Sequence, residues 1–223
     1  MMKQKDFFNN LWRENRERSD ITKLQAYDPQ TIYVSLIAKI ENVLAEKIYS
    51  KTRQSIYDKF SNAYLYSPSQ YHITVVGFPS VSELANLKVD TKSLNMIIAE
   101  AIDETPSIEL ELKNLNILPG TVIVEAYDLS GQLQSLTAEV SNSFMRLANA
   151  PEPVKSLRRE KWWITLARLE ANMKDLVSLV KRYRPHLFGK FRISTLEFVS
   201  TDKTFTLERT KTIASYKLQK DDR

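Results

Sequence analysis

Apolar residues recur along this chain with two different spacings, which predict helices and strands in alternation. In residues 41–60, Val43, Leu44 and Ile48 are separated by polar and charged residues, a spacing typical of an amphipathic helix. In residues 107–118, apolar and polar residues alternate, as in a strand with one buried face. Helices are thus predicted at residues 5–20, 41–60, 91–104, 132–149 and 172–184. Strands are predicted at residues 31–38, about 71–77, 107–118, 121–127, 161–169, 191–200 and 204–218, with turns at 185–189 and 201–203.

The predicted elements fall into two comparable halves, each with strands, helices and antiparallel hairpins. This order predicts an α+β fold with an internal pseudo-repeat, folded as a single bilobed domain over residues 25–223. Residues 1–24 are expected to contain an appended N-terminal helix with apolar side chains on one face. These side chains are Phe7, Phe8, Leu11 and Trp12. The stripe is expected to dock on the body of the protein, and binding of a partner is the alternative.

Composition excludes several kinds of site. The 223 residues include no Cys, which excludes disulfides, thiolate zinc sites and cysteine nucleophiles. Only two His are present, so a multi-histidine metal centre is not expected. No apolar run of about 18 residues and no signal peptide is found, so we expect a cytoplasmic protein without a membrane partner. The pattern does not indicate an oligomeric state.

Charge is unevenly distributed along the chain, whose formal net charge is +5. Residues 151–223 carry 17 Lys and Arg against 9 Asp and Glu, whereas residues 1–150 carry 15 against 18. A basic C-terminal third is compatible with an anionic ligand such as a phosphate or a nucleic acid. A distribution that only solvates the surface is the alternative.

Two of the predicted strands carry a matched pattern. The first contains His72-Ile73-Thr74 and the second contains Trp163-Ile164-Thr165, at a spacing of 91 residues. Because residues i and i+2 of a strand share a face, His72 and Thr74 point the same way, and so do Trp163 and Thr165. Lys161 shares the face of Trp163, whereas Arg168 has the opposite parity to Thr165. We therefore expect Arg168 at the surface or in an ion pair between the lobes.

This arrangement resembles the two-histidine (2H) phosphoesterase superfamily, which includes 2′-5′ RNA ligase-like proteins and cyclic phosphodiesterases. That family carries two His-x-Thr/Ser motifs, one per lobe, and the second is often followed by Leu-Ala-Arg, as at residues 166–168 here. The resemblance covers roughly residues 30–218. It implies two pseudo-repeated halves whose antiparallel sheets flank a central cleft, with helices outside. It also implies an RNA or nucleotide ligand and no metal or other cofactor.

The resemblance assigns catalytic positions to His72, Thr74 and Thr165. In the family, two imidazoles act as base and acid on opposite sides of the phosphorus, and the Thr hydroxyls hold the phosphate oxygens. Here Trp163 stands at the second histidine position, and an indole transfers no proton at neutral pH. We therefore expect binding with weak or absent catalysis, in which Trp163 offers a stacking surface for a base and Lys161 a charge for a phosphate.

Two alternatives stay open at this point. One is a non-enzymatic interaction or regulatory module that keeps the bilobed fold. The other is an active phosphodiesterase with a rewired general acid. His186 is the remaining histidine, but it lies in the predicted turn at residues 185–189, and nothing in the sequence places it near the cleft.

Overall fold

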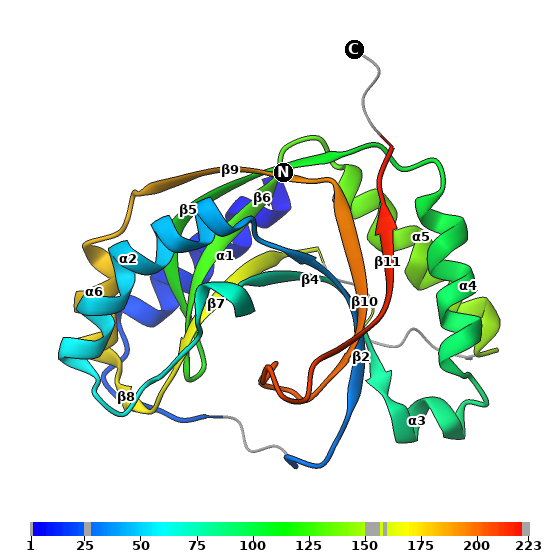
Figure 1. The fold of residues 1–223 in the computed structure, drawn as a ribbon. Coiled ribbons are helices and arrows are strands. Elements are labelled where there is room, and N and C mark those ends of the chain that lie inside the picture. The colour runs from blue at the N-terminus through cyan, green and yellow to red at the C-terminus, as the bar shows by residue number, and fades with distance from the viewer. Residues whose placement is uncertain (1, 25–27, 150–156, 158–159, 220–223) are drawn as a thin grey trace.

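The computed structural model describes residues 2–24, 28–149, 157 and 160–219, which form an α+β fold (Figure 1). The helices are α1 (Met2–Arg16), α2 (Asn42–Lys59), α3 (Val81–Asn86), α4 (Thr91–Ile102), α5 (Gln132–Leu147) and α6 (Met173–Lys181), with a 3-10 turn at Pro68–Gln70. The strands are β1 (Ile21–Thr22), β2 (Tyr33–Lys39), β3 (Tyr64–Leu65), β4 (His72–Ser80), β5 (Ile108–Leu118), β6 (Thr121–Asp128), β7 (Trp162–Arg168), β8 (Ala171–Asn172), β9 (Leu187–Ile193), β10 (Thr195–Thr201) and β11 (Lys211–Lys217).

One curled antiparallel sheet forms the body of the protein. Its strand order is β11-β10-β2-β4-β7-β6-β5-β9, with the short β3 paired to β7, while β1 and β8 pair separately. The two halves meet at the pairing of β4 with β7, where Ile73 lies opposite Ile164. We call β11, β10, β2 and β4 the first lobe, and β7, β6, β5 and β9 the second lobe. Figure 1 shows the strong curl, which turns the sheet into a half-barrel.

Helices cover the outer face of each lobe. Helices α4 and α5 pack together beside the first lobe, and α2 and α6 pack against β9 and β5 of the second lobe (Figure 1). A continuous apolar core lies between helices and sheet, and Ile73 and Ile164 are both fully buried in it. The predicted fold is thereby confirmed, with the sheets of the two halves joined into one. No helix among the residues described is long and apolar enough to cross a membrane.

The N-terminal helix α1 docks on β5 and β6 through its aromatic stripe, as the spacing predicts. Phe8 is fully buried against Ile123 and Tyr127, and Phe7 and Leu11 pack around this small cluster. The division of the chain into a helix at residues 1–24 and a domain at 25–223 stays a prediction, because docking does not show which part folds alone.

The C-terminal third departs from the predicted elements. The single strand expected at residues 191–200 is two strands, β9 and β10, which separate at Ser194. β9 begins at Leu187, inside the expected turn. The expected strand at 204–218 begins only at Lys211, and residues 202–210 form a loop instead of a tight turn. The short helix α3 is a further element that the pattern does not predict. It begins at Val81, and the preceding Ser80 caps it, because the Ser80 hydroxyl accepts from the backbone N–H of Glu83.

Candidate functional site

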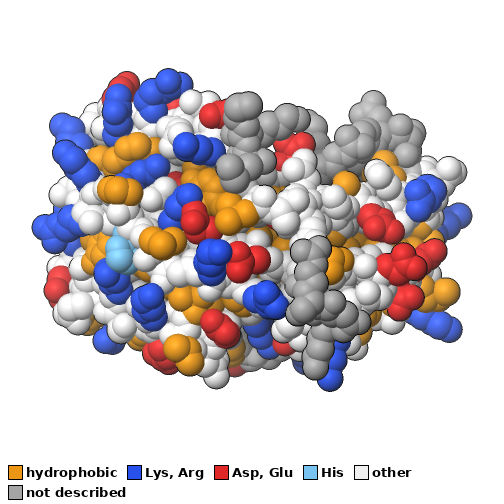
Figure 2. Space-filling view, turned by 90° about the horizontal axis from the view of Figure 1, so that it is seen from above, with side chains coloured by type: hydrophobic (Ala, Val, Ile, Leu, Met, Phe, Trp, Pro, Cys, Tyr) orange, Lys and Arg blue, Asp and Glu red, His pale blue; other side chains and the backbone are white. Residues whose placement is uncertain are grey.

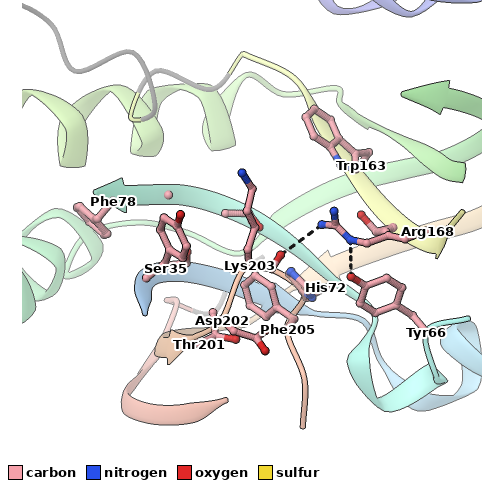
Figure 3. A pocket seen from close by; sticks show the side chains of 14 residues that line it. Ser35, Tyr66, His72, Phe78, Trp163, Arg168, Thr201, Asp202, Lys203 and Phe205 are labelled. Atoms are coloured by element: carbon pink, nitrogen blue, oxygen red, sulfur yellow. Dashed lines mark hydrogen bonds between the residues drawn. The ribbon is translucent and has the colours of Figure 1, made fainter. Parts of the chain in front are cut away.

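A cavity of about 470 Å³ opens on the concave side of the sheet, between the first lobe and β7 (Figure 3). A volume of this size falls in the range of small-molecule sites. Its lining comes from β2, β4, β7, the residue that follows β3, the end of β10 and the loop after β10. The residues are Tyr33, Ser35, Tyr66, His72, Thr74, Gly77, Phe78, Trp163, Thr165, Arg168, Thr201, Asp202, Lys203 and Phe205.

His72, at the start of β4, is held in one orientation by the turn before it. Its Nδ1 lies 2.8 Å from the backbone carbonyl oxygen of Gln70. A carbonyl can only accept, so Nδ1 carries a proton and Nε2 is the nitrogen that can exchange one. Gln70 is fixed in turn, because its Oε1 accepts from the backbone N–H and the hydroxyl of Ser67. The Ser-Pro turn therefore positions the imidazole.

Phe205 lies against the ring of His72. The ring centres are 3.9 Å apart and the planes are inclined by 33°. The carbonyl oxygen of Phe205 accepts from Nε2 of Gln70 at 3.0 Å, so Gln70 contacts both His72 and the loop that covers it. Figure 3 shows the side chains of Phe205 and His72 next to each other in the lining of the cavity.

Asp202 organises the loop that carries Phe205. Its carboxylate accepts from the backbone N–H and the hydroxyl of both Thr204 and Thr206, at 2.8–3.1 Å. Burial raises the pKa of Asp202, but these four hydrogen bonds outweigh it, and the pKa is lowered overall. The charged form of Asp202 is therefore the one that keeps the loop folded.

The two matched motifs meet in this cavity. His72 and Thr74 reach it from the first lobe, and Trp163 and Thr165 reach it from the second. Trp163 has a second contact, because it also packs against the cluster of Phe8 with Ile123 and Tyr127 under α1. The indole therefore forms a wall between the cavity and the N-terminal helix.

Arg168 also reaches the cavity, which corrects the position expected from its parity. The pairing of β7 with β6 shifts by one residue between Thr165 and Ala167, so the strand carries a bulge. Leu166 and Ala167 both face the core, and Arg168 returns to the face of Thr165. Its Nε donates to the hydroxyl of Tyr66 at 2.7 Å, and its Nη2 donates to the carbonyl of Lys203 at 3.3 Å (Figure 3).

Two other candidates from the sequence lie elsewhere. Lys161 does not line the cavity, and its Nζ sits 3.8 Å from the ring centre of Phe7 on α1. His186 comes directly before β9, the edge strand at the far side of the sheet, and lies beside Phe188 with ring centres 4.6 Å apart. Partial burial and then the nearby Lys51 and Lys47 lower the pKa of His186.

Figure 2 shows an outer face of the molecule, where basic side chains are most frequent at the left end.

The loop at residues 202–210 is the part of the site that the sequence did not indicate. Asp202, Lys203 and Phe205 all line the cavity from it. A local signal was available, because Asp followed by Thr at positions i+2 and i+4 favours side-chain-to-backbone turns over strands.

No three His, Cys, Asp or Glu side chains among the residues described are grouped so that they could hold a metal ion.

Comparison with known proteins gives a match in fold alone. No family model and no curated protein matches the sequence. Among solved structures, E. coli LigT in its apo form is 12% identical, with a TM-score of 0.58 over 85% of this chain and 98% of LigT. The protein TT0787 of Thermus thermophilus is 16% identical, with a TM-score of 0.57 over 85% of this chain and 99% of that chain. Both have the 2H phosphoesterase fold, which confirms the resemblance at the level of the fold.

Proposed function

We propose that this protein binds an RNA or nucleotide phosphodiester in the cavity and that its catalysis is weak or absent. The observation that carries the proposal is the meeting of His72, Thr74 and Thr165 at one cavity, with Trp163 beside them. A phosphate between the two lobes is within reach of hydroxyl donors from both sides. Arg168 and Lys203 add positive charge to the same lining.

Structures with the same fold support a nucleotide as the ligand. E. coli LigT has been crystallised with ATP, with 3′-AMP and with NADP+, at 12–14% identity to this chain. These ligands share a nucleoside and a phosphate group. The aromatic side chains in the lining, such as Phe205 and Trp163, offer flat surfaces to a base, and the polar ones suit a phosphate.

Weak catalysis follows from the groups available for proton transfer. His72 Nε2 can take up or release one proton, but cleavage of a cyclic phosphate or a 2′-5′ linkage needs both a base and an acid. Trp163 cannot supply the second group. Tyr66 lines the cavity, but burial raises its pKa to about 12, which makes it a poor acid at neutral pH. We therefore prefer binding with little turnover to the alternative of a rewired acid.

The test is a calorimetric titration with 2′,3′-cyclic AMP at low and at moderate salt, with a turnover assay on the same nucleotide. Wild type is expected to bind more weakly as salt rises, with turnover at or below detection. Lys203→Ala is expected to weaken binding by about tenfold, because it removes a charge from the lining. Lys211→Ala is the matched control, since Lys211 is exposed on β11 and does not line the cavity.

Each result decides between the open alternatives. Equal loss of affinity in both lysine variants contradicts binding in this cavity. Absence of binding at low salt favours the non-enzymatic interaction module. Rapid turnover by wild type contradicts weak catalysis and shows that another group acts as the acid.

A further inference from the structure

The helix α1 lies on the cleft face of the second lobe. Strand register fixes this face, because Thr165 is paired with Ile123 and Trp163 with Glu125, and paired residues point to the same side of a sheet. Trp163 and Thr165 line the cavity, so Ile123 and Glu125 belong to the concave side as well. Ile123 is fully buried, and the side chain that covers it is Phe8 of α1.

The two lobes differ in what covers their concave faces. On the first lobe, Ser35, His72 and Thr74 border the open cavity. On the second lobe, every residue of β6 from Thr121 to Asp128 is buried, so both faces of this strand are covered. One face packs in the main core, and the other packs against α1. Among the α1 residues whose side chains the structure describes, 4–16, none lines the cavity.

Polar contacts fix α1 in this place along its whole length. Near its start, Gln4 Nε2 donates to the carbonyl of Ala126. In its middle, the carbonyl of Phe8 accepts from Asn116 Nδ2 at 3.0 Å. Near its end, the buried Asn15 donates from Nδ2 to the carbonyl of Ile117 at 2.7 Å. The helix is therefore bound specifically and not only through its apolar stripe.

A buried ionic cluster lies beneath the helix. Glu125 is fully buried and accepts from Asn116, Asn114, Tyr127 and Arg184 at 2.6–2.8 Å. The guanidinium of Arg184 also lies 5.0 Å from the ring centre of Trp12. These polar groups on the concave face are all engaged within the protein, so they are not displayed to a ligand.

We infer that α1 makes the cleft one-sided, so that the site accepts a nucleotide with a terminal phosphate and excludes an internal phosphodiester. This inference rests on the proposed function. A phosphate held between Thr74 and Thr165 has the first lobe on one side, where a nucleoside has room, and Trp163 backed by Phe8 on the other. A second nucleoside that continues from the phosphate across the second lobe has to occupy the place of α1. The favoured ligand class is therefore a 2′,3′-cyclic or terminal phosphate, in preference to a 2′-5′-linked dinucleotide.

The position of the helix can be tested without any ligand, because the chain contains no Cys. Ile123→Cys places a thiol under α1, Val124→Cys places one in the main core, and Thr74→Cys places one in the cavity. We expect a maleimide to label the thiol at 123 about a hundredfold more slowly than the one at 74. Adding Phe8→Ala and Leu11→Ala, which remove two α1 side chains from the cluster around Ile123, should accelerate labelling at 123 but not at 124. Asn9→Ala, on the exposed side of α1, is the matched control.

The inferred preference for a cyclic or terminal phosphate is tested by comparing the affinities for 2′,3′-cyclic AMP and 2′-5′-linked ApA by calorimetry. Wild type is expected to prefer the cyclic nucleotide by at least about tenfold, and the helix-loosened variant should narrow this ratio. If that double variant does not fold, Phe8→Ala alone serves. Equal affinity of wild type for both ligands overturns the inference and leaves the proposed function standing. Absence of binding by both ligands overturns the proposed function and, with it, the inferred preference for a cyclic or terminal phosphate. In the labelling experiment, rapid reaction of the thiol at position 123 overturns the placement of the helix.

Discussion

The imidazole of His72 is held between a hydrogen bond and an aromatic ring. Its Nδ1 donates to the carbonyl of Gln70, and its face lies 3.9 Å, centre to centre, from Phe205. Phe205 adopts a φ of +54°, a left-handed conformation that costs a residue other than glycine about 1–2 kcal/mol. The hydrogen bonds of Asp202 and Gln70 hold the loop in this conformation. The position of Phe205 over the imidazole is thus imposed by the loop.

The stacking of Phe205 on His72 has a direct spectroscopic consequence. In Phe205→Leu, the ring protons of His72 should move downfield, because the ring current of the aromatic neighbour is lost. Proton NMR measures this well, since the chain has only two histidines and His72→Ala assigns the signals. The signal of His186, which lies elsewhere, is the internal control. An unchanged His72 signal contradicts the stacked arrangement in solution.

The charge of Asp202 should make the stability of the loop depend on pH. Because its pKa is lower in the folded protein, the stabilisation is present above the unfolded pKa of about 4 and is lost as pH falls through the folded pKa. Asp202→Asn should lower the free energy of unfolding by about 2 kcal/mol at neutral pH. The difference from wild type should shrink below about pH 4, as measured by urea unfolding at several pH values.

Glu208→Gln is the control for this experiment, because Glu208 lies on the same loop with an exposed side chain. It should leave both the free energy of unfolding and its pH dependence within error of wild type. A difference between wild type and Asp202→Asn that stays constant down to low pH shows that the carboxylate charge is not what holds the loop.

The buried pair of Glu125 and Arg184 should contribute far more than an exposed pair. Arg184→Met leaves the carboxylate buried without its cation, so we expect a loss of about 3 kcal/mol in the free energy of unfolding. Lys190→Met breaks the exposed pair with Glu109 and should cost less than about 1 kcal/mol. Denaturant unfolding of both variants measures the contrast. Similar losses in the two variants contradict the role given to burial.

The sequence was sufficient to predict the fold and the two motifs because regular strands obey simple alternation. In β4 and β7, His72, Thr74, Trp163 and Thr165 reach the same cavity, as the i, i+2 rule requires. For Arg168 the i, i+2 rule predicts the wrong face of β7, because a bulge adds one residue to the strand. No feature of the composition marks that bulge.

The C-terminal third was harder to predict because local propensity and tertiary context disagree there. Residues 204–206, Thr-Phe-Thr, have high strand propensity, but the four hydrogen bonds to Asp202 fold them into a loop. The sequence pattern places Gly189 in a turn, whereas it lies inside β9. A Cβ there would come 3.3 Å from Leu44 Cδ1, so this glycine allows α2 to approach the strand closely.

Restoring an imidazole at position 163 should restore catalysis at a cost in stability. Trp163→His places a second proton-transfer group in the lining that already contains His72, Thr74 and Thr165. Loss of one such group costs about 10²–10⁴ in rate, so turnover of a 2′,3′-cyclic nucleotide should rise by about 10² or more. The smaller ring also leaves a space beside Phe8, which should lower the free energy of unfolding by about 2 kcal/mol.

Two further variants separate the chemistry from the change in packing. Trp163→Phe also replaces the indole by a smaller ring but adds no imidazole, so it should lose stability without gaining turnover. His72→Ala in the Trp163→His background should abolish the gain, because cleavage again lacks one of its two proton-transfer groups. Equal turnover in the Phe and His variants shows that opening the cavity, and not the imidazole, limits activity. A folded Trp163→His protein that cleaves neither cyclic nor 2′-5′ substrates, while wild type still binds nucleotide, shows that Trp163 is not what separates this cavity from an active one.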